Sequence, residues 1–165
     1  MPPRDIDRPG QLIADPTEGV VRRALRNRKQ PMVFDQRMQC YRLPASAFEP
    51  RLPQNRPNAH RFDRYLSVNV ESSLLEDGLA LDWGCDHLRF YAGRLTVASI
   101  ATVPLTVSWE PVEPDAPDPG NPHHGAINGL VELYYEAMDR YELAIQRLAR
   151  ASQILSACLT ASGTN

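Results

Sequence analysis

The chain has 165 residues, of which 42% are hydrophobic and 23% charged, and it carries a net charge of −2. A chain of this length buries one core, so the sequence predicts a single domain. It contains no apolar run of the roughly 18 residues that a membrane span needs, and its start lacks the apolar region of a secretory signal, so we expect a cytoplasmic protein with no membrane partner.

The N-terminal part combines a tail with a basic segment. Residues 1–15 hold three prolines and few apolar side chains, so we expect a flexible tail ahead of one α+β domain over residues 16–165. Residues 16–28 are predicted to form a helix that Thr17 opens and Pro31 ends. Its basic side chains form either a nucleic-acid interface, a contact for an acidic protein surface, or the solvated face of a docked helix. They are Arg22, Arg23, Arg26, Arg28 and Lys29.

The middle of the chain contains both weak and clear secondary-structure patterns. Residues 32–43 predict a strand, and four prolines between residues 44 and 58 predict an extended loop that Phe48 anchors. Apolar side chains alternate over residues 65–71, which indicates a half-buried strand, and residues 72–78 predict one helical turn closed by Gly78.

Residues 79–109 complete the expected sheet. Residues 79–93 alternate like a strand but contain no β-branched residue, so we predict a helix over 82–92 that stops at Gly93, with a hairpin as the alternative. Residues 94–109 are rich in β-formers and predict two strands bent at Pro104. The expected fold is therefore α+β, with a mainly antiparallel sheet over about residues 65–109.

A long C-terminal helix is predicted to cover this sheet. Apolar side chains recur there on alternating steps of four and three residues, which gives one continuous stripe. We interpret the stripe as the core face of the helix, while pairing with a second copy of the chain or with another protein remains the alternative. The stripe consists of Tyr134, Met138, Tyr141, Ile145, Leu148, Ser152 and Leu155.

His123 and His124 follow a proline-rich arm at what we expect to be the start of that helix. A histidine at a helix N-terminus is disfavoured in its charged form, and a neutral imidazole can act as a general base. The sequence has no Walker loop, nucleophile elbow, dinucleotide fingerprint or zinc-protease motif, and its only lysine is Lys29. Conventional hydrolase, kinase and dinucleotide sites are therefore not expected.

Cysteine and histidine provide the ligand types that zinc prefers, and Cys85, His87, His123 and His124 are the candidates. On the predicted helix, Cys85 and His87 would diverge by roughly 200° and could hardly share an ion. We therefore predict no metal and no cofactor. Cys40, Cys85 and Cys158 lie far apart and form no C-x-x-C pair, so reduced thiols are expected.

These observations favour a non-enzymatic interaction subunit of a larger complex, with a protein partner and with homo-oligomerisation as a further option. Because 17 of the 18 basic residues are arginine, which is typical of a high-GC coding sequence, we expect a bacterial source. A small hydrolase-type enzyme that uses His123 or His124 as general base is the alternative, and a nucleic-acid-binding module is the third interpretation.

Overall fold

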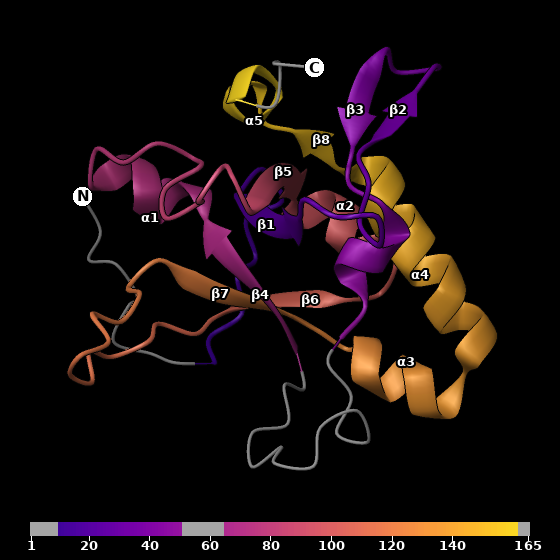
Figure 1. Ribbon diagram of the computed structural model, residues 1–165. Coiled ribbons are helices and arrows are strands. Elements are labelled where there is room, and N and C mark those ends of the chain that lie inside the picture. Colours follow the sequence, from indigo (N-terminus) through magenta and orange to yellow (C-terminus); the bar gives the residue numbers. More distant parts are fainter. Residues whose placement is uncertain (1–9, 51–64, 162–165) are drawn as a thin grey trace.

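The computed structural model describes residues 10–50 and 65–161, and these residues form an α+β fold (Figure 1). A six-stranded antiparallel sheet has the order β6-β7-β4-β1-β5-β8, and a small hairpin stands apart from it. The predicted fold class and the antiparallel sheet are thus confirmed. The sheet strands are β1 (Gly19–Leu25), β4 (Tyr65–Val70), β5 (Phe90–Thr96), β6 (Thr106–Trp109), β7 (His124–Asn128) and β8 (Gln153–Ile154), and the hairpin is β2 (Val33–Asp35) with β3 (Cys40–Arg42).

The helices are short apart from one. They are η2 (Ala45–Phe48), α1 (Glu71–Glu76), α2 (Val97–Ala101), α3 (Leu130–Glu136), α4 (Met138–Ala151) and α5 (Ser156–Ala161). α4 contacts η2, α2, α3 and β3, and its buried side chains join those of the sheet in one core cluster. Within the described ranges, no helix has the length and apolar character that crossing a membrane requires.

The core follows from the strand register. Residues directly opposite one another in a sheet share a face, and Val20 lies opposite Val70 and Leu95. All three are at most 1% exposed. Phe48 is fully buried in the same core, as expected for an anchor of the predicted loop. The extended conformation predicted there is wrong for residues 45–48, which form η2, and residues 51–58 of that loop lie outside the described residues.

The basic segment is a central strand, so the predicted helix over residues 16–28 is wrong. β1 pairs with β5 along its whole length, from Gly19 opposite Thr96 to Leu25 opposite Phe90, and with β4 at its start. Burial of Val20 and Val21 between two neighbouring strands outweighs the modest helix preference of the arginines, because tertiary context overrides intrinsic propensity.

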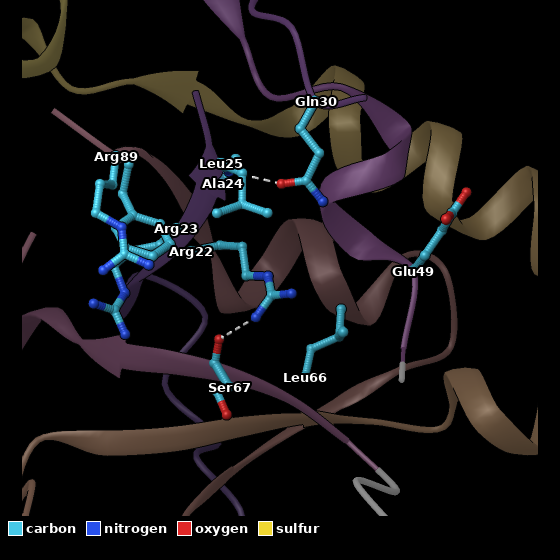
Figure 2. Close-up of a pocket in the computed structure, with 10 residues that line it drawn as sticks. Arg22, Arg23, Ala24, Leu25, Gln30, Glu49, Leu66, Ser67 and Arg89 are labelled. Carbon is cyan, nitrogen blue, oxygen red and sulfur yellow. Dashed lines mark hydrogen bonds between the residues drawn. The ribbon is translucent and has the colours of Figure 1, made fainter. Parts of the chain in front are cut away.

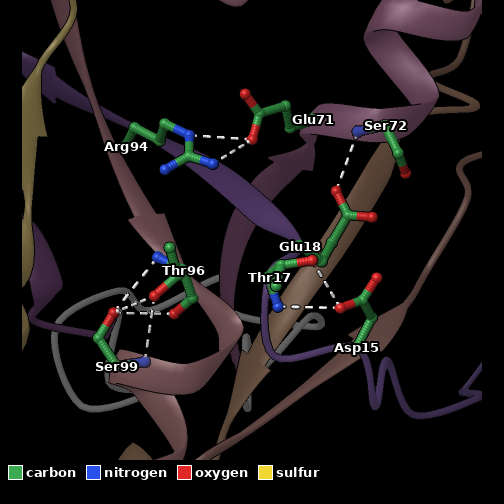
Figure 3. A network of polar contacts seen from close by, with 8 residues as sticks. All are labelled: Asp15, Thr17, Glu18, Glu71, Ser72, Arg94, Thr96 and Ser99. Carbon is green, nitrogen blue, oxygen red and sulfur yellow. Dashed lines mark hydrogen bonds and ion pairs between the residues drawn. The ribbon is translucent and has the colours of Figure 1, made fainter.

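The start of β1 is held by polar side chains from several elements (Figure 3). Glu18 accepts a hydrogen bond from the backbone N–H of Ser72 at 2.9 Å, which satisfies an amide in the first turn of α1. Glu71 binds Arg94 on β5. Upstream of residue 16, Leu12 bridges Ser108 and Ile13 donates to Val107, so residues 10–13 lie along β6, whereas residues 1–9 of the predicted tail lie outside the described residues.

Two expectations for residues 79–109 need correction. Turns replace the predicted helix over 82–92 and β5 begins at Phe90. Gly84 has φ of +73°, a left-handed conformation that interrupts a helix. Further on, one helix separates the two strands that we expected to be bent at Pro104, because Thr96 and Ser99 form a capping box that starts α2.

The strand and the helical turn predicted over residues 65–78 are confirmed. β4 occupies the predicted strand, and α1 is the predicted helical turn, followed by Gly78 with φ of +69°. Residues 32–43 form the β2–β3 hairpin rather than one strand, since Asp35 accepts the amides of Arg37 and Met38 and so closes a turn.

The predicted continuous C-terminal helix is interrupted. Ala137 adopts φ of −154° between α3 and α4, and Ser152 is already extended. Leu155 donates its N–H to Ala92, because β8 returns to pair with β5 at the edge of the sheet. The stripe is therefore divided among α3, α4 and the segment after α4.

Candidate functional site

The sheet opens between β1 and β4, and Arg22 spans the opening. The two strands pair only at Val20 with Val70 and at Val21 with Asn69. Beyond that point Arg22 donates from Nη1 to the carbonyl of Ser67 at 2.9 Å (Figure 2). Its Nε donates to the carbonyl of Ala47, also at 2.9 Å. The guanidinium thus satisfies the carbonyl of Ser67 on β4, beyond the point where the two strands pair, and connects β4 to η2.

A cavity of about 500 Å³ occupies this opening. Its volume lies within the range of ligand pockets. Its described lining contains three arginines and one carboxylate, which makes the cavity electropositive. The lining residues are Arg22, Arg23, Ala24, Leu25, Gln30, Glu49, Leu66, Ser67, Arg89 and Phe90.

Arg23 and Arg89 both lie near one aromatic ring in this cavity. Their guanidinium carbons lie 5.4 and 5.3 Å from the centroid of Phe90. Arg23 also donates to the carbonyl of Gly84 at 3.1 Å. Neither arginine pairs with a carboxylate in the part of the chain that the structure describes. Two like charges on one ring repel each other, and an anion between them relieves that repulsion.

A second, smaller cavity of about 70 Å³ continues the first along β1 and β4. Both cavities are lined by Arg22, Arg23 and Ser67. The smaller one adds polar side chains from β4 and from the end of the proline-rich arm, namely Asn69, Asn121 and His124. Because the two cavities share three lining residues, we name them together the arginine groove.

His123 and His124 have different surroundings although they are adjacent in sequence. His124 is the first residue of β7 and His123 comes directly before it, so their predicted position at a helix N-terminus is wrong. His124 lines the arginine groove, and its Nδ1 lies 2.6 Å from the carbonyl of Glu110. An N–H at Nδ1 can donate to that carbonyl, which fixes the orientation of the ring.

His123 is buried, with an exposed fraction of 2%. Its Nδ1 lies 2.8 Å from Ser73 Oγ, its Nε2 lies 3.5 Å from a carboxylate oxygen of Asp77, and its ring packs edge-on against Trp83. Ser73 is only 1% exposed, so a substrate carbonyl cannot reach its hydroxyl. The arrangement has the residue types of a catalytic triad but attaches α1 to β7 instead.

The five predicted basic residues do not form one patch. Arg26 donates to the carbonyls of Phe90 and Cys158 and lies over the ring of Tyr91. Arg28 and Lys29 are exposed beyond the end of β1. Only Arg22 and Arg23 face the groove, and Arg89, which sequence reasoning missed, joins them. The register of β1 with β5 was the missing information, because it places Phe90 and its neighbours beside Leu25.

The apolar stripe, which we interpreted as the core face of the helix, lies largely in the core. Tyr141, Ile145 and Leu148 are at most 7% exposed in the core cluster, and Met138 is 42% exposed. Tyr134 and Leu155 are partly buried against the same cluster. The stripe therefore contributes to folding within the chain.

The thiols are not poised as nucleophiles. Burial raises the pKa of Cys85 to about 11 and also raises the pKa of Cys158, whereas a nucleophilic cysteine needs a lowered pKa. These two cysteines and His87 form the group of described residues that could hold a metal ion. Sequence reasoning missed Cys158 because it comes from the far end of the chain.

Comparison with protein-family models, with curated proteins and with solved structures found no significant match for this chain.

Proposed function

We propose that this protein is a non-enzymatic interaction subunit that binds an acidic segment of a protein partner in the arginine groove. One observation carries the proposal: the guanidinium groups of Arg23 and Arg89 both lie near the ring of Phe90 in an electropositive cavity, and neither has a carboxylate partner among the described residues. The guanidinium group binds carboxylates through two parallel hydrogen bonds, so an acidic side chain fits this position.

The shape of the groove favours an extended chain over a compact molecule. Its two cavities follow β1 and β4 and share Arg22, Arg23 and Ser67. An extended peptide can place one acidic side chain near Arg23 and Arg89 while its backbone passes the amide groups of Asn69 and Asn121.

Single-stranded nucleic acid is less well suited. Such ligands usually stack their bases on aromatic rings, and Phe90 is the aromatic side chain of the described groove lining. The guanidinium groups of Arg23 and Arg89 already lie over that ring. An enzyme that uses His123 is also less well supported, because that side chain is buried.

We further propose that the protein acts in the cytoplasm of a bacterium as part of a larger complex. The three cysteines are free, which is typical of a reducing compartment. The arginine-rich composition is typical of a high-GC coding sequence.

Fluorescence polarisation with a labelled deca-glutamate peptide tests the binding. We expect binding to the wild-type chain at about 50 mM salt and clear weakening at about 200 mM, because screening reduces charge attraction. The Arg23→Gln/Arg89→Gln variant should bind at least about tenfold more weakly, which corresponds to 1.4 kcal/mol. A deca-glutamine peptide should not bind.

The matched control is Arg147→Gln/Arg150→Gln, which removes the same charge from exposed positions of α4. It should bind like the wild type. An equal loss in this control would show that only net charge matters and would overturn the groove. Tighter binding of a deca-thymidine oligonucleotide than of the glutamate peptide would instead favour a nucleic-acid partner.

A further inference from the structure

Three side chains with metal-binding atoms converge outside the lining of the arginine groove. The ligand atoms of Cys85, His87 and Cys158 all lie within 4.8 Å of one another. Cys85 and His87 belong to the turns before β5, and Cys158 belongs to α5. The fold thus brings together two thiols and one imidazole from distant parts of the chain.

His87 is oriented as a metal ligand would be. Its Nε2 lies 2.8 Å from Asp82 Oδ2, whereas its Nδ1 is buried without a hydrogen-bond partner. Buried ring nitrogens rarely stay unbonded. In metalloproteins a carboxylate commonly holds one nitrogen of a ligating histidine and leaves the lone pair of the other for the ion. Asp82 and His87 match that arrangement.

The backbone around the cluster is fixed by contacts that are independent of any ion. The amide of Ala92 donates to the sulfur of Cys158 at 3.3 Å, and Arg26 donates to the carbonyl of the same residue at 3.0 Å. On the other side, Arg23 donates to the carbonyl of Gly84, next to Cys85. Arg23 on β1 and Arg26, the residue that follows β1, therefore bind one segment each.

We propose that Cys85, His87 and Cys158 bind one Zn²⁺ ion through their two sulfur atoms and Nδ1 of the imidazole. Zinc takes four nitrogen or sulfur ligands in a tetrahedron, and thiolate donors favour it over magnesium or calcium. Cys85 and His87 are only half-buried, so water or a further ligand completes the fourth position. Asp82 is a positioning residue.

This inference revises the expectation that the protein holds no metal. That expectation depended on a helix over residues 82–92, in which Cys85 and His87 would point apart. The turns around Gly84 remove the helix. The proposed ion lies near the arginine groove, because Arg89 follows His87 by two residues, but none of its three protein ligands lines the groove.

Titration of the reduced full-length protein with Zn²⁺ and Co²⁺ tests the site. We expect one equivalent of either ion to bind, Co²⁺ to give the intense visible bands of a tetrahedral thiolate site, and Zn²⁺ to raise the unfolding temperature, because an ion that binds only the folded state stabilises it. Cys85→Ser and His87→Gln should abolish the Co²⁺ bands. Asp82→Asn should keep them but lower the affinity by about 10- to 100-fold.

Cys40→Ser is the matched control, since Cys40 lies on β3 outside the cluster and is also half-buried. It should bind Zn²⁺ like the wild type. His87→Gln keeps the test decisive if a cysteine variant fails to fold, because His87 is partly exposed. Failure of the folded, reduced wild type to bind either ion would overturn the site, and so would a Cys85–Cys158 disulfide that forms in air while the reduced protein binds no metal.

Discussion

Arg94 on β5 donates two hydrogen bonds to Oε2 of Glu71, from Nε at 2.9 Å and from Nη2 at 2.6 Å. The pair passes directly over Gly19, where a Cβ atom would lie 1.8 Å from Oε2 of Glu71 and 2.9 Å from Nε of Arg94. The ion pair between α1 and β5 (Figure 3) thus occupies the space that a side chain at Gly19, the first residue of β1, would need.

We expect Gly19→Ala to break this ion pair. The single substitutions Gly19→Ala and Glu71→Gln should each destabilise the protein by about 1 kcal/mol or more, since the carboxylate of Glu71 is mostly buried. The double variant should lose less free energy of unfolding than the two single variants together, because both changes remove the same interaction. Urea unfolding of the three variants measures this coupling, and full additivity would contradict the shared contact.

Two buried tyrosines make the free energy of unfolding depend on pH in the alkaline range. Burial raises the pKa of Tyr141 to about 12 and also raises the pKa of Tyr91. An unfolded tyrosine releases its proton near pH 10. From about pH 10 upward the unfolded chain therefore binds fewer protons than the folded protein, so the free energy of unfolding falls as pH rises. Below about pH 10 this contribution is fully present.

Urea unfolding between about pH 9 and 11.5 should show this fall, with a slope of up to about 1.4 kcal/mol per pH unit for each such tyrosine. The variant Tyr141→Phe should reduce the slope because it removes one of the titrating groups. An unchanged slope in Tyr141→Phe would contradict the role of that residue.

The parts of the fold that the sequence predicts are those with a strong local signal. The alternation of Leu66, Val68 and Val70 marks β4, and Gly78 marks the end of α1. β1 was missed because its position depends on pairing with β5, whose residues lie about 70 positions further along the chain. Local sequence does not contain that register.

The same limit applies to the candidate sites. His124 and Arg23 could be singled out from the sequence, but only the register of β1 and β5 places Arg89 beside Arg23. Cys158 likewise meets Cys85 only because β8 turns α5 back over the sheet edge. Residue types indicate which chemistry is possible, whereas the pairing of strands that are distant in sequence decides which side chains come into contact.

The buried hydrogen bond between Ser73 and His123 should be structural. Ser73→Ala removes the hydroxyl that bonds Nδ1 of His123 inside the protein, and the loss of a buried partner costs about 1–3 kcal/mol. Ser72→Ala is the matched control, because Ser72 is exposed and keeps its backbone bond to Glu18. Chemical denaturation should show a lower midpoint only for Ser73→Ala. Equal midpoints would show that His123 does not need this contact.

The buried face of α4 should decide whether the chain folds. Ile145 and Leu148 are 7% and 0% exposed in the core, and losing each such side chain costs about 2–5 kcal/mol out of a total stability of about 5–15 kcal/mol. We therefore expect Ile145→Ser/Leu148→Ser to unfold the protein, as circular dichroism would show. The control Met138→Ser/Leu143→Ser changes side chains of α4 that are 42% and 46% exposed, and it should stay folded. If the first variant instead stayed folded and light scattering showed only a fall in molecular mass from oligomer to monomer, the face of α4 would be an interface between chains.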